Sequence, residues 1–227
     1  ILISLEHLNT RSAKSFRRSV MESSRNFYTE TVLGGWKPAE VFTGKDVLIL
    51  GSGPGIKQHR RALEQYIRRC SPMVIALNTG QAIDSECVDF HIASHPLRLA
   101  ADCELYPSMP HPLIAPISAL PDHIRARLKG VDVKDFGIGI EDEKFEFHGT
   151  HAIIPQPLVF AYALGVVTSG KARRVFIAGL DGYPAGDSRN DEIEHLIRLY
   201  NSTSDSLRII SITPTRYGVD IHSVYSL

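Results

Sequence analysis

The stretch that decides the fold is Asp46-Val47-Leu48-Ile49-Leu50, which runs directly into Gly51-Ser52-Gly53-Pro54-Gly55. A short apolar run that ends in a glycine-rich turn is typical of the first strand of an α/β protein, where the turn leads into a helix. Such a turn brings backbone N–H groups close to a bound phosphate, because glycine has no side chain to hold the ligand away. The spacing is G-x-G-P-G and not the full dinucleotide pattern G-x-G-x-x-G. The alternative interpretation is an ordinary strand–helix turn that needs glycine only for its backbone angles.

From residue 45 onward, short apolar runs alternate with helical patterns, which is typical of parallel βαβ units. We expect strands at 46–50, 73–77, 89–93, 113–115, 131–136, 174–178 and 208–212. We expect helices near 56–69, 97–104, 121–128, 157–169 and 191–200. The strands lack polar alternation, which predicts burial on both faces. The predicted fold is therefore α/β and Rossmann-like, with a mostly parallel, doubly wound sheet of about six or seven strands and helices on both faces.

Glycine and proline at positions 34–38 interrupt the helical pattern that precedes them. We therefore expect an N-terminal helical segment at 1–37 and a Rossmann-like nucleotide-binding domain at 38–227. The chain begins with Ile1, so we expect it to be a piece of a longer protein. The segment 141–156 is acidic and contains glycine; we expect either a lid over a site or a solvated surface loop.

The composition limits the class of partner. With 25 basic and 25 acidic residues among 227, the chain has no overall field that would attract nucleic acid or an anionic membrane. Its longest apolar runs are too short to span a bilayer. Cys70, Cys87 and Cys103 form no C-x-x-C pair, which favours a reduced, cytoplasmic compartment, small buried side chains and no metal site.

Polar residues follow several of the predicted strands, and in an open parallel sheet the strand ends border the ligand crevice. Asn78 and Thr79 follow the second strand; the Asn78 amide suits a base edge or a ribose hydroxyl, or else closes a turn. His95 follows the third strand and is a candidate general base or phosphate donor. Arg98, just beyond it, is a candidate anion ligand because its planar guanidinium matches phosphate or carboxylate. His91, inside an apolar strand, is expected to be a core histidine.

The last two strands are also followed by polar groups. Asp181 lies just after the apolar 174–178 run and could accept a ribose hydroxyl, bind a shared Mg²⁺ or take a proton from an acceptor. The alternative is a turn that holds Gly182. Further candidate substrate ligands lie nearby at Tyr183, Asp187, Arg189, Thr213, Thr215 and Arg216.

One resemblance is to bacterial sialyltransferases and to the related archaeal hydroxymethylpterin pyrophosphokinase-like proteins. It is carried by Gly51–Gly55, by Asn78, and by the run from Phe160 through Leu164 to Asp181-Gly182-Tyr183. The resemblance implies that Gly51, Gly53 and Asn78 hold the CMP of a CMP-sugar donor.

A second resemblance covers nearly the whole chain and is to the C-terminal region of certain bacterial aldolases. It is carried by Gly34-Gly35-Trp36-Lys37-Pro38, His95-Pro96-Leu97-Arg98-Leu99 and the run from Ile212 to Tyr217. In those proteins a pyruvate-aldolase barrel of the hydroxymethylglutaryl-CoA lyase or 4-hydroxy-2-oxovalerate aldolase type precedes this domain. The resemblance implies that residues 1–31 are the tail of the barrel, that the aldolase is a partner within the same parent chain, and that the setting is surface-polysaccharide synthesis.

Three functions follow as hypotheses. The first is a glycosyltransferase-like domain in which the Gly51–Gly55 amides bind the donor phosphate and His95 or Asp181 deprotonates the acceptor. The second is a diphosphate transferase that uses ATP and Mg²⁺ at Asp181 and Asp187. The third is a non-catalytic module that senses a ligand or assembles the aldolase. The base, the sugar, the acceptor and a homo-oligomeric state are left open.

Overall fold

The structure is a computed structural model and describes residues 32–227. The helices are α2 (Ala39–Phe42), α3 (Pro54–Gln58), α4 (Arg60–Cys70), α5 (Pro96–Ala101), α6 (Asp122–Arg125), α7 (Val159–Ser169) and α8 (Arg189–Asn201). The strands are β1 (Asp46–Leu50), β2 (Met73–Leu77), β3 (Phe90–Ile92), β4 (Leu113–Ala115), β5 (Val133–Asp135), β6 (Gly137–Ile140), β7 (Glu146–Phe147), β8 (His151–Ile154), β9 (Arg174–Ala178), β10 (Ile209–Ser211) and β11 (Asp220–Ile221). Every strand and helix predicted from residue 45 onward therefore has a counterpart, although the helix predicted at 56–69 is divided into α3 and α4 at His59.

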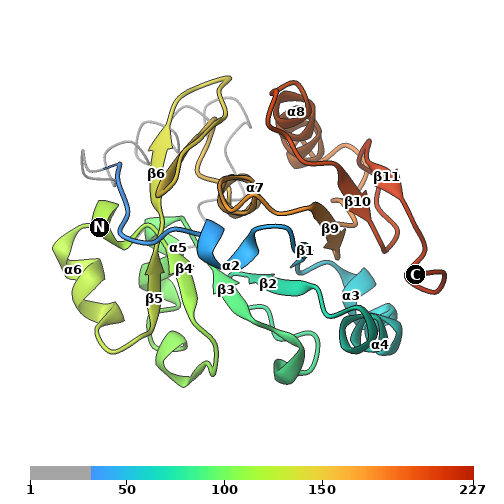
Figure 1. Ribbon diagram of the computed structural model, residues 1–227, viewed down its shortest axis with the longest axis horizontal. Coiled ribbons are helices and arrows are strands. Elements are labelled where there is room, and N and C mark those ends of the chain that lie inside the picture. The colour runs from blue at the N-terminus through green and yellow to red at the C-terminus, as the bar shows by residue number, and fades with distance from the viewer. Residues whose placement is uncertain (1–31) are drawn as a thin grey trace.

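The centre of the fold is an eight-stranded sheet with the order β11-β10-β9-β1-β2-β3-β4-β5. Each neighbouring pair in it is parallel. The chain builds β1 to β5 outward in one direction, returns to the centre, and places β9 beside β1 before it builds outward the other way (Figure 1). The predicted doubly wound, mostly parallel α/β sheet is confirmed, with one strand more than the upper expected number.

The reversal of strand order lies between β1 and β9, whose residues pair from Asp46 with Arg174 to Leu50 with Ala178. In open α/β sheets the loops leave this point in opposite directions and a crevice opens at the carboxyl ends of the strands. The glycine-rich turn after β1 and the Gly179–Tyr183 loop after β9 therefore face each other across it.

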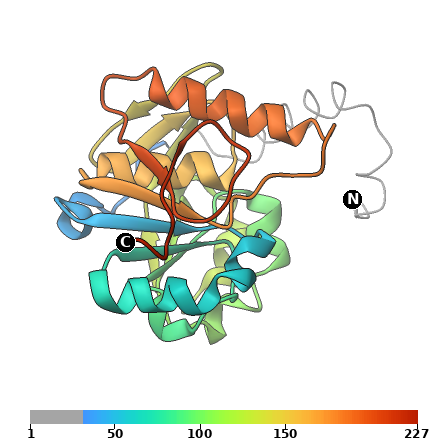
Figure 2. The same cartoon turned by 90° about the vertical axis from the view of Figure 1, so that its right-hand side faces the viewer.

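Alternating side chains of the strands point to two different cores. Val47 and Ile49 belong to the core under α7 and α8, whereas Leu48 and Leu50 belong to the core under α4. Figure 2 shows this layering, with α8 on one side of the sheet and α4 on the other. The helix α7 is buried on nearly its whole circumference, as its apolar sequence demands.

The segment predicted as a lid or loop at 141–156 contains two strands, which join β6 (Gly137–Ile140). Together they form a second, three-stranded sheet of order β6-β8-β7, and β8 packs against α7. Ala152 and Ile154 on β8 are fully buried. The interpretation of 141–156 as a lid or a solvated loop is therefore wrong for β7 and β8, because this apolar segment covers the core.

The predicted N-terminal helices fall within residues 1–31, outside the described residues. The residues that follow are tied to the domain: the Trp36 amide donates to the Asp135 carbonyl at 2.9 Å, and the indole ring packs near Phe42 and Phe90. Cys87 and Cys103 are buried as expected, whereas Cys70 is exposed at the end of α4, which corrects the prediction for that residue.

Candidate functional site

The glycine-rich turn after β1 is bonded to the loop after β9. The Gly51 amide donates to the Ala178 carbonyl at 2.8 Å and the Gly53 amide to the Gly179 carbonyl at 2.9 Å. The Gly55 amide donates to the Asp181 carboxylate at 2.5 Å. These three N–H groups are therefore already satisfied by the protein, and the prediction that they form an open phosphate cradle is corrected.

The glycines serve a close approach between the two loops. A Cβ atom added to Gly53 would lie 2.7 Å from the Gly179 carbonyl oxygen, and one added to Gly55 would lie 2.6 Å from an oxygen of Asp181. Both distances are shorter than real Cβ contacts, so the backbones meet here only because the side chains are missing. Ser52, at the exposed tip of the turn, has no hydrogen bond to any residue in 32–227.

The Asp181 carboxylate occupies the position that a phosphate takes at the start of a helix in many nucleotide-binding folds. Its Oδ2 accepts the Gly55 N–H at the second residue of α3. Its Oδ1 is buried and has no hydrogen-bond partner among the described residues. Beside it lies a pocket of about 320 Å³ lined by Pro54, Gly55, Gln58, Asp181, Pro214, Thr215 and Arg216, which we call the switch-point pocket.

The segment after β10 supports this pocket. The buried Thr213 hydroxyl accepts the Gly179 N–H at 3.0 Å, and the Thr215 hydroxyl donates to the Leu180 carbonyl at 2.6 Å. Both hydroxyls hold the β9 loop, so the prediction that they bind substrate is corrected for Thr213, which is only 2% exposed. Arg216 is exposed, lines the pocket and donates to the Tyr183 carbonyl at 2.5 Å.

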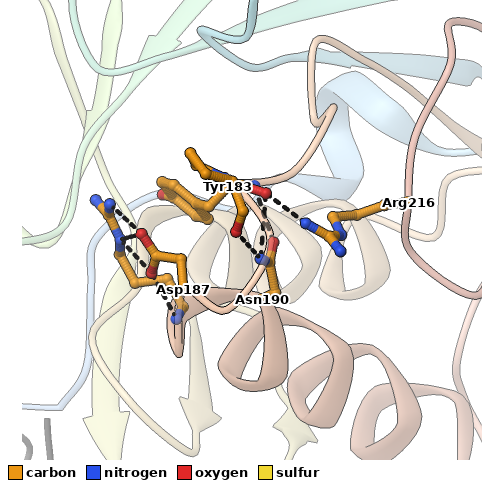
Figure 3. A network of polar contacts seen from close by, with 6 residues as sticks. Tyr183, Asp187, Asn190 and Arg216 are labelled. Atoms are coloured by element: carbon orange, nitrogen blue, oxygen red, sulfur yellow. Dashed lines mark hydrogen bonds and ion pairs between the residues drawn. The ribbon is translucent and has the colours of Figure 1, made fainter.

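The loop from Tyr183 to Arg189 is fastened by local contacts. Figure 3 shows Asn190 and Arg216 converging on Tyr183, whose amide donates to the Asn190 side chain at 2.8 Å. Arg189 stacks over the Tyr183 ring at 3.9 Å and binds Asp187 through both carboxylate oxygens. Those hydrogen bonds lower the pKa of Asp187 to about 2. Since its oxygens are taken by Arg189, Asp187 is a poor second Mg²⁺ ligand beside Asp181.

Asn78 follows β2 and has the left-handed conformation, with a φ of 54°. Its backbone carbonyl contacts His91 Nδ1 at 3.0 Å, which confirms His91 as a buried, hydrogen-bonded core residue. The Asn78 side-chain amide has no hydrogen bond to any residue in the described part of the chain. The neighbouring Thr79 hydroxyl lies 3.4 Å from Asp102.

His95 precedes α5, and its side chain is partly buried. Burial lowers its pKa below the ordinary value, so the neutral imidazole persists to lower pH. Arg98, one turn along α5, forms an ion pair with Asp102 at 2.6 Å. The predicted anion ligand is therefore partly neutralised within its own helix.

The two predicted catalytic residues lie at different parts of the sheet edge. Asp181 follows β9 and His95 follows β3, which are separated by β1 and β2. Neighbouring strands are about 4.8 Å apart, so three strand spacings amount to about 14 Å. Asp181 and His95 therefore cannot act on the same substrate atom in this arrangement, although an extended ligand could reach both.

Three residues of the site were not predicted. Gln58 and Pro214 line the switch-point pocket, and Asn190 fastens the β9 loop. Gln58 stands four residues after Pro54, so both residues lie on the same face of α3. This spacing could have been used to predict that Gln58 lies beside the turn. Asn190 is one of the polar residues that follow the 174–178 strand, but the sequence gives no sign that it bonds to Tyr183 and Pro184.

Within residues 32–227, no group of three or more His, Cys, Asp or Glu side chains is arranged to hold a metal ion. In the same part of the chain, no helix has both the length and the apolar composition needed to cross a membrane.

The sheet order and the crevice at its reversal place the protein in the doubly wound, Rossmann-like class of α/β proteins. No protein-family model matches the chain, and no curated protein sequence matches it. Among solved structures it is similar to the MAf glycosyltransferase from Magnetospirillum magneticum AMB-1, with 15% sequence identity and a TM-score of 0.49. The match covers 92% of this chain and 38% of that chain, so the chain spans well under half the length of that protein. A likeness of this degree assigns no activity.

Proposed function

We propose that the switch-point pocket binds the sugar hydroxyls of a nucleotide or nucleotide-sugar and that the domain is glycosyltransferase-like. The observation that carries the proposal is the Asp181 carboxylate at the edge of a pocket of about 320 Å³, placed where the strand order reverses. A carboxylate accepts hydrogen bonds from hydroxyl groups, and ligands of open α/β sheets bind at this point.

The Gly51, Gly53 and Gly55 amides are already hydrogen-bonded within the protein, so the group of the ligand at this position is a sugar and not a phosphate. Because Asp181 already sits on the Gly55 N–H, a phosphate in that position would meet a like charge at close range. Sugar hydroxyls, by contrast, are able to donate hydrogen bonds to the Asp181 carboxylate. Arg216 supplies the positive charge of the pocket for an acidic group of the ligand, and Ser52 offers an unpaired hydroxyl at the tip of the turn.

On the other side of the β1 turn, Asn78 and His95 are the groups that remain for the rest of the ligand and for the acceptor. The Asn78 amide both donates and accepts hydrogen bonds, which suits a base edge or a sugar. A neutral His95 imidazole is able to take the proton of an acceptor hydroxyl as the sugar is transferred to it. In this proposal His95 is the general base and Asp181 is a binding residue.

Calorimetric titration with CMP, CDP, UDP, ADP and GDP tests the proposal. We expect at least one of them to bind, and Asp181→Asn to weaken that binding about tenfold or more, because the amide keeps the Gly55 contact but loses the charge. Asn78→Gly is expected to weaken it as well while it preserves the left-handed backbone. The matched control is Asp132→Asn, an exposed carboxylate paired with Lys134.

The proposal is wrong if none of the five nucleotides binds, or if Asp181→Asn and Asp132→Asn have the same affinity as the unchanged protein. Binding that is never accompanied by transfer or hydrolysis of a sugar donor would instead favour the non-catalytic sensing module.

We also propose, from the sequence resemblance alone, that the domain is appended to a pyruvate aldolase. The test uses the full-length parent protein and measures pyruvate released from a 4-hydroxy-2-oxo acid. A parent chain without this activity would remove the association and leave the nucleotide proposal untouched.

A further inference from the structure

A second pocket, of about 440 Å³, lies at the junction of α3 and α4. Its lining residues are Lys57, Gln58, His59, Arg60, Arg61, Ala62, Gln65 and Tyr225; we call it the basic pocket. Figure 1 places the C-terminal end of the chain, which supplies Tyr225, beside α3 and α4. The proposed function leaves this pocket unused.

Two of the three cationic side chains that line the basic pocket have no acidic partner among the described residues. Its lining contains no aspartate or glutamate. Arg60 is held by Glu64 at 2.7 Å, but Lys57 and Arg61 have no acidic partner within residues 32–227. They lie on either side of the break between α3 and α4, and both line the pocket. Two unpaired cations that line one cavity favour a ligand with two negative charges.

Tyr225 forms the apolar wall. Its hydroxyl lies 3.1 Å from His59 Nδ1, and the two rings meet edge to face with centroids 5.7 Å apart. His59 thus fixes the position of Tyr225, although the tyrosine side chain is 71% exposed. An aromatic ring held in place and left open to solvent offers a flat surface to an organic group.

The two pockets share Gln58 and differ in charge. The switch-point pocket contains the Asp181 carboxylate, which disfavours phosphate, whereas the basic pocket contains only neutral and positive side chains. Guanidinium and ammonium groups bind phosphate through charge-assisted hydrogen bonds, and arginine does so with two parallel bonds.

We propose that the basic pocket binds the phosphate of a small phosphate ester, with Lys57 and Arg61 on the phosphate and the Tyr225 ring against the organic part. The cavity exceeds the size of a phosphate group, which leaves room for the remainder of the ester. This site is independent of the switch-point pocket, so either proposal holds if the other fails.

Titrations of the protein with inorganic pyrophosphate and with phenyl phosphate, followed by calorimetry or amide NMR, test the site. We expect both to bind, and the double variant Lys57→Gln/Arg61→Gln to lose at least tenfold in affinity for each, with weaker binding at high salt. Tyr225→Ala is expected to weaken phenyl phosphate and leave pyrophosphate unchanged. Asp181→Asn should alter neither, which separates this result from the test of the nucleotide site.

The matched control is Arg69→Gln/Lys129→Gln, which removes the same charge from exposed positions outside the pocket. Equal losses in both double variants would overturn the proposal, because the binding would then follow net charge alone. Absence of binding up to 10 mM pyrophosphate would also overturn it. So would sedimentation with phosphatidic acid vesicles that the Lys57→Gln/Arg61→Gln change abolishes, since the ligand would then be a lipid headgroup and not a small ester.

Discussion

The loops on the two sides of β1 use their polar residues in different ways. After β9 and β10, Asp181, Thr213 and Thr215 are bonded to backbone groups of neighbouring loops. After β2 and β3, the side chains of Asn78 and His95 have no hydrogen bond to any residue in 32–227. Some polar groups that end parallel strands therefore hold neighbouring loops and others are left for a ligand, while Asp181 has one oxygen bonded to Gly55 and one without a partner among the described residues. A strand-end position by itself does not tell these roles apart.

The largest effect is expected where the two loops touch. A Cβ on Gly51 would overlap the Gly179 carbonyl, which is backbone and has little freedom to move. We therefore expect Gly51→Ala to lower the free energy of unfolding by about 2 to 3 kcal/mol, measured by urea denaturation. Gly149→Ala is the control, because a Cβ there meets nothing within 4 Å. Equal stability of the two variants would show that the loops are not in close contact.

A smaller effect on stability is expected from two threonines, one in each of the two groups of loops beside β1. Thr213→Val removes the buried acceptor of the Gly179 N–H and is expected to cost about 1 to 2 kcal/mol. Thr79→Val removes only a 3.4 Å contact with Asp102 and should change stability by less than about 0.5 kcal/mol. Urea denaturation of both variants measures the difference. A larger loss for Thr79→Val would reverse the comparison.

The arrangement of the main sheet could be predicted because its signal is local. Apolar runs such as Asp46–Leu50 and Arg174–Ala178 identify their strands without knowledge of their neighbours. The strands β7 and β8 could not, since β7 has only two residues and β8 is stabilised by packing against α7, which is a tertiary contact. The acidic residues nearby suggested a solvated loop instead.

The strand-end positions of the candidate residues could be read from the sequence, but their hydrogen-bond partners could not. The sequence predicts that the glycine turn and Asp181 each follow a strand, and the structure shows that these two strands, β1 and β9, are neighbours. The sequence contains no sign that the carboxylate reaches the Gly55 amide, because those residues are 126 positions apart and meet only through the β1–β9 pairing. Long-range contacts decide which hydrogen-bonding groups are already paired within the protein. A short sequence motif therefore does not predict this pairing.

The smallest expected effect is the contribution of His95, in the loop after β3, to the pH dependence of stability. Burial disfavours the imidazolium, so an NMR titration should give a midpoint below the ordinary value of 6.5. The unfolded chain then binds a proton at this position before the folded protein does. As a result, this residue's contribution makes the protein less stable as the pH falls from about 6.5 through the folded pKa.

The variant His95→Gln assigns the NMR signal and should remove this part of the pH dependence while it leaves stability at neutral pH nearly unchanged. A lowered pKa keeps the ring neutral over a wider pH range, and the neutral ring is the form that accepts a proton. A midpoint at or above 6.5 would mean that a negative group compensates the burial. In that case the expected loss of stability with falling pH at this position would be absent.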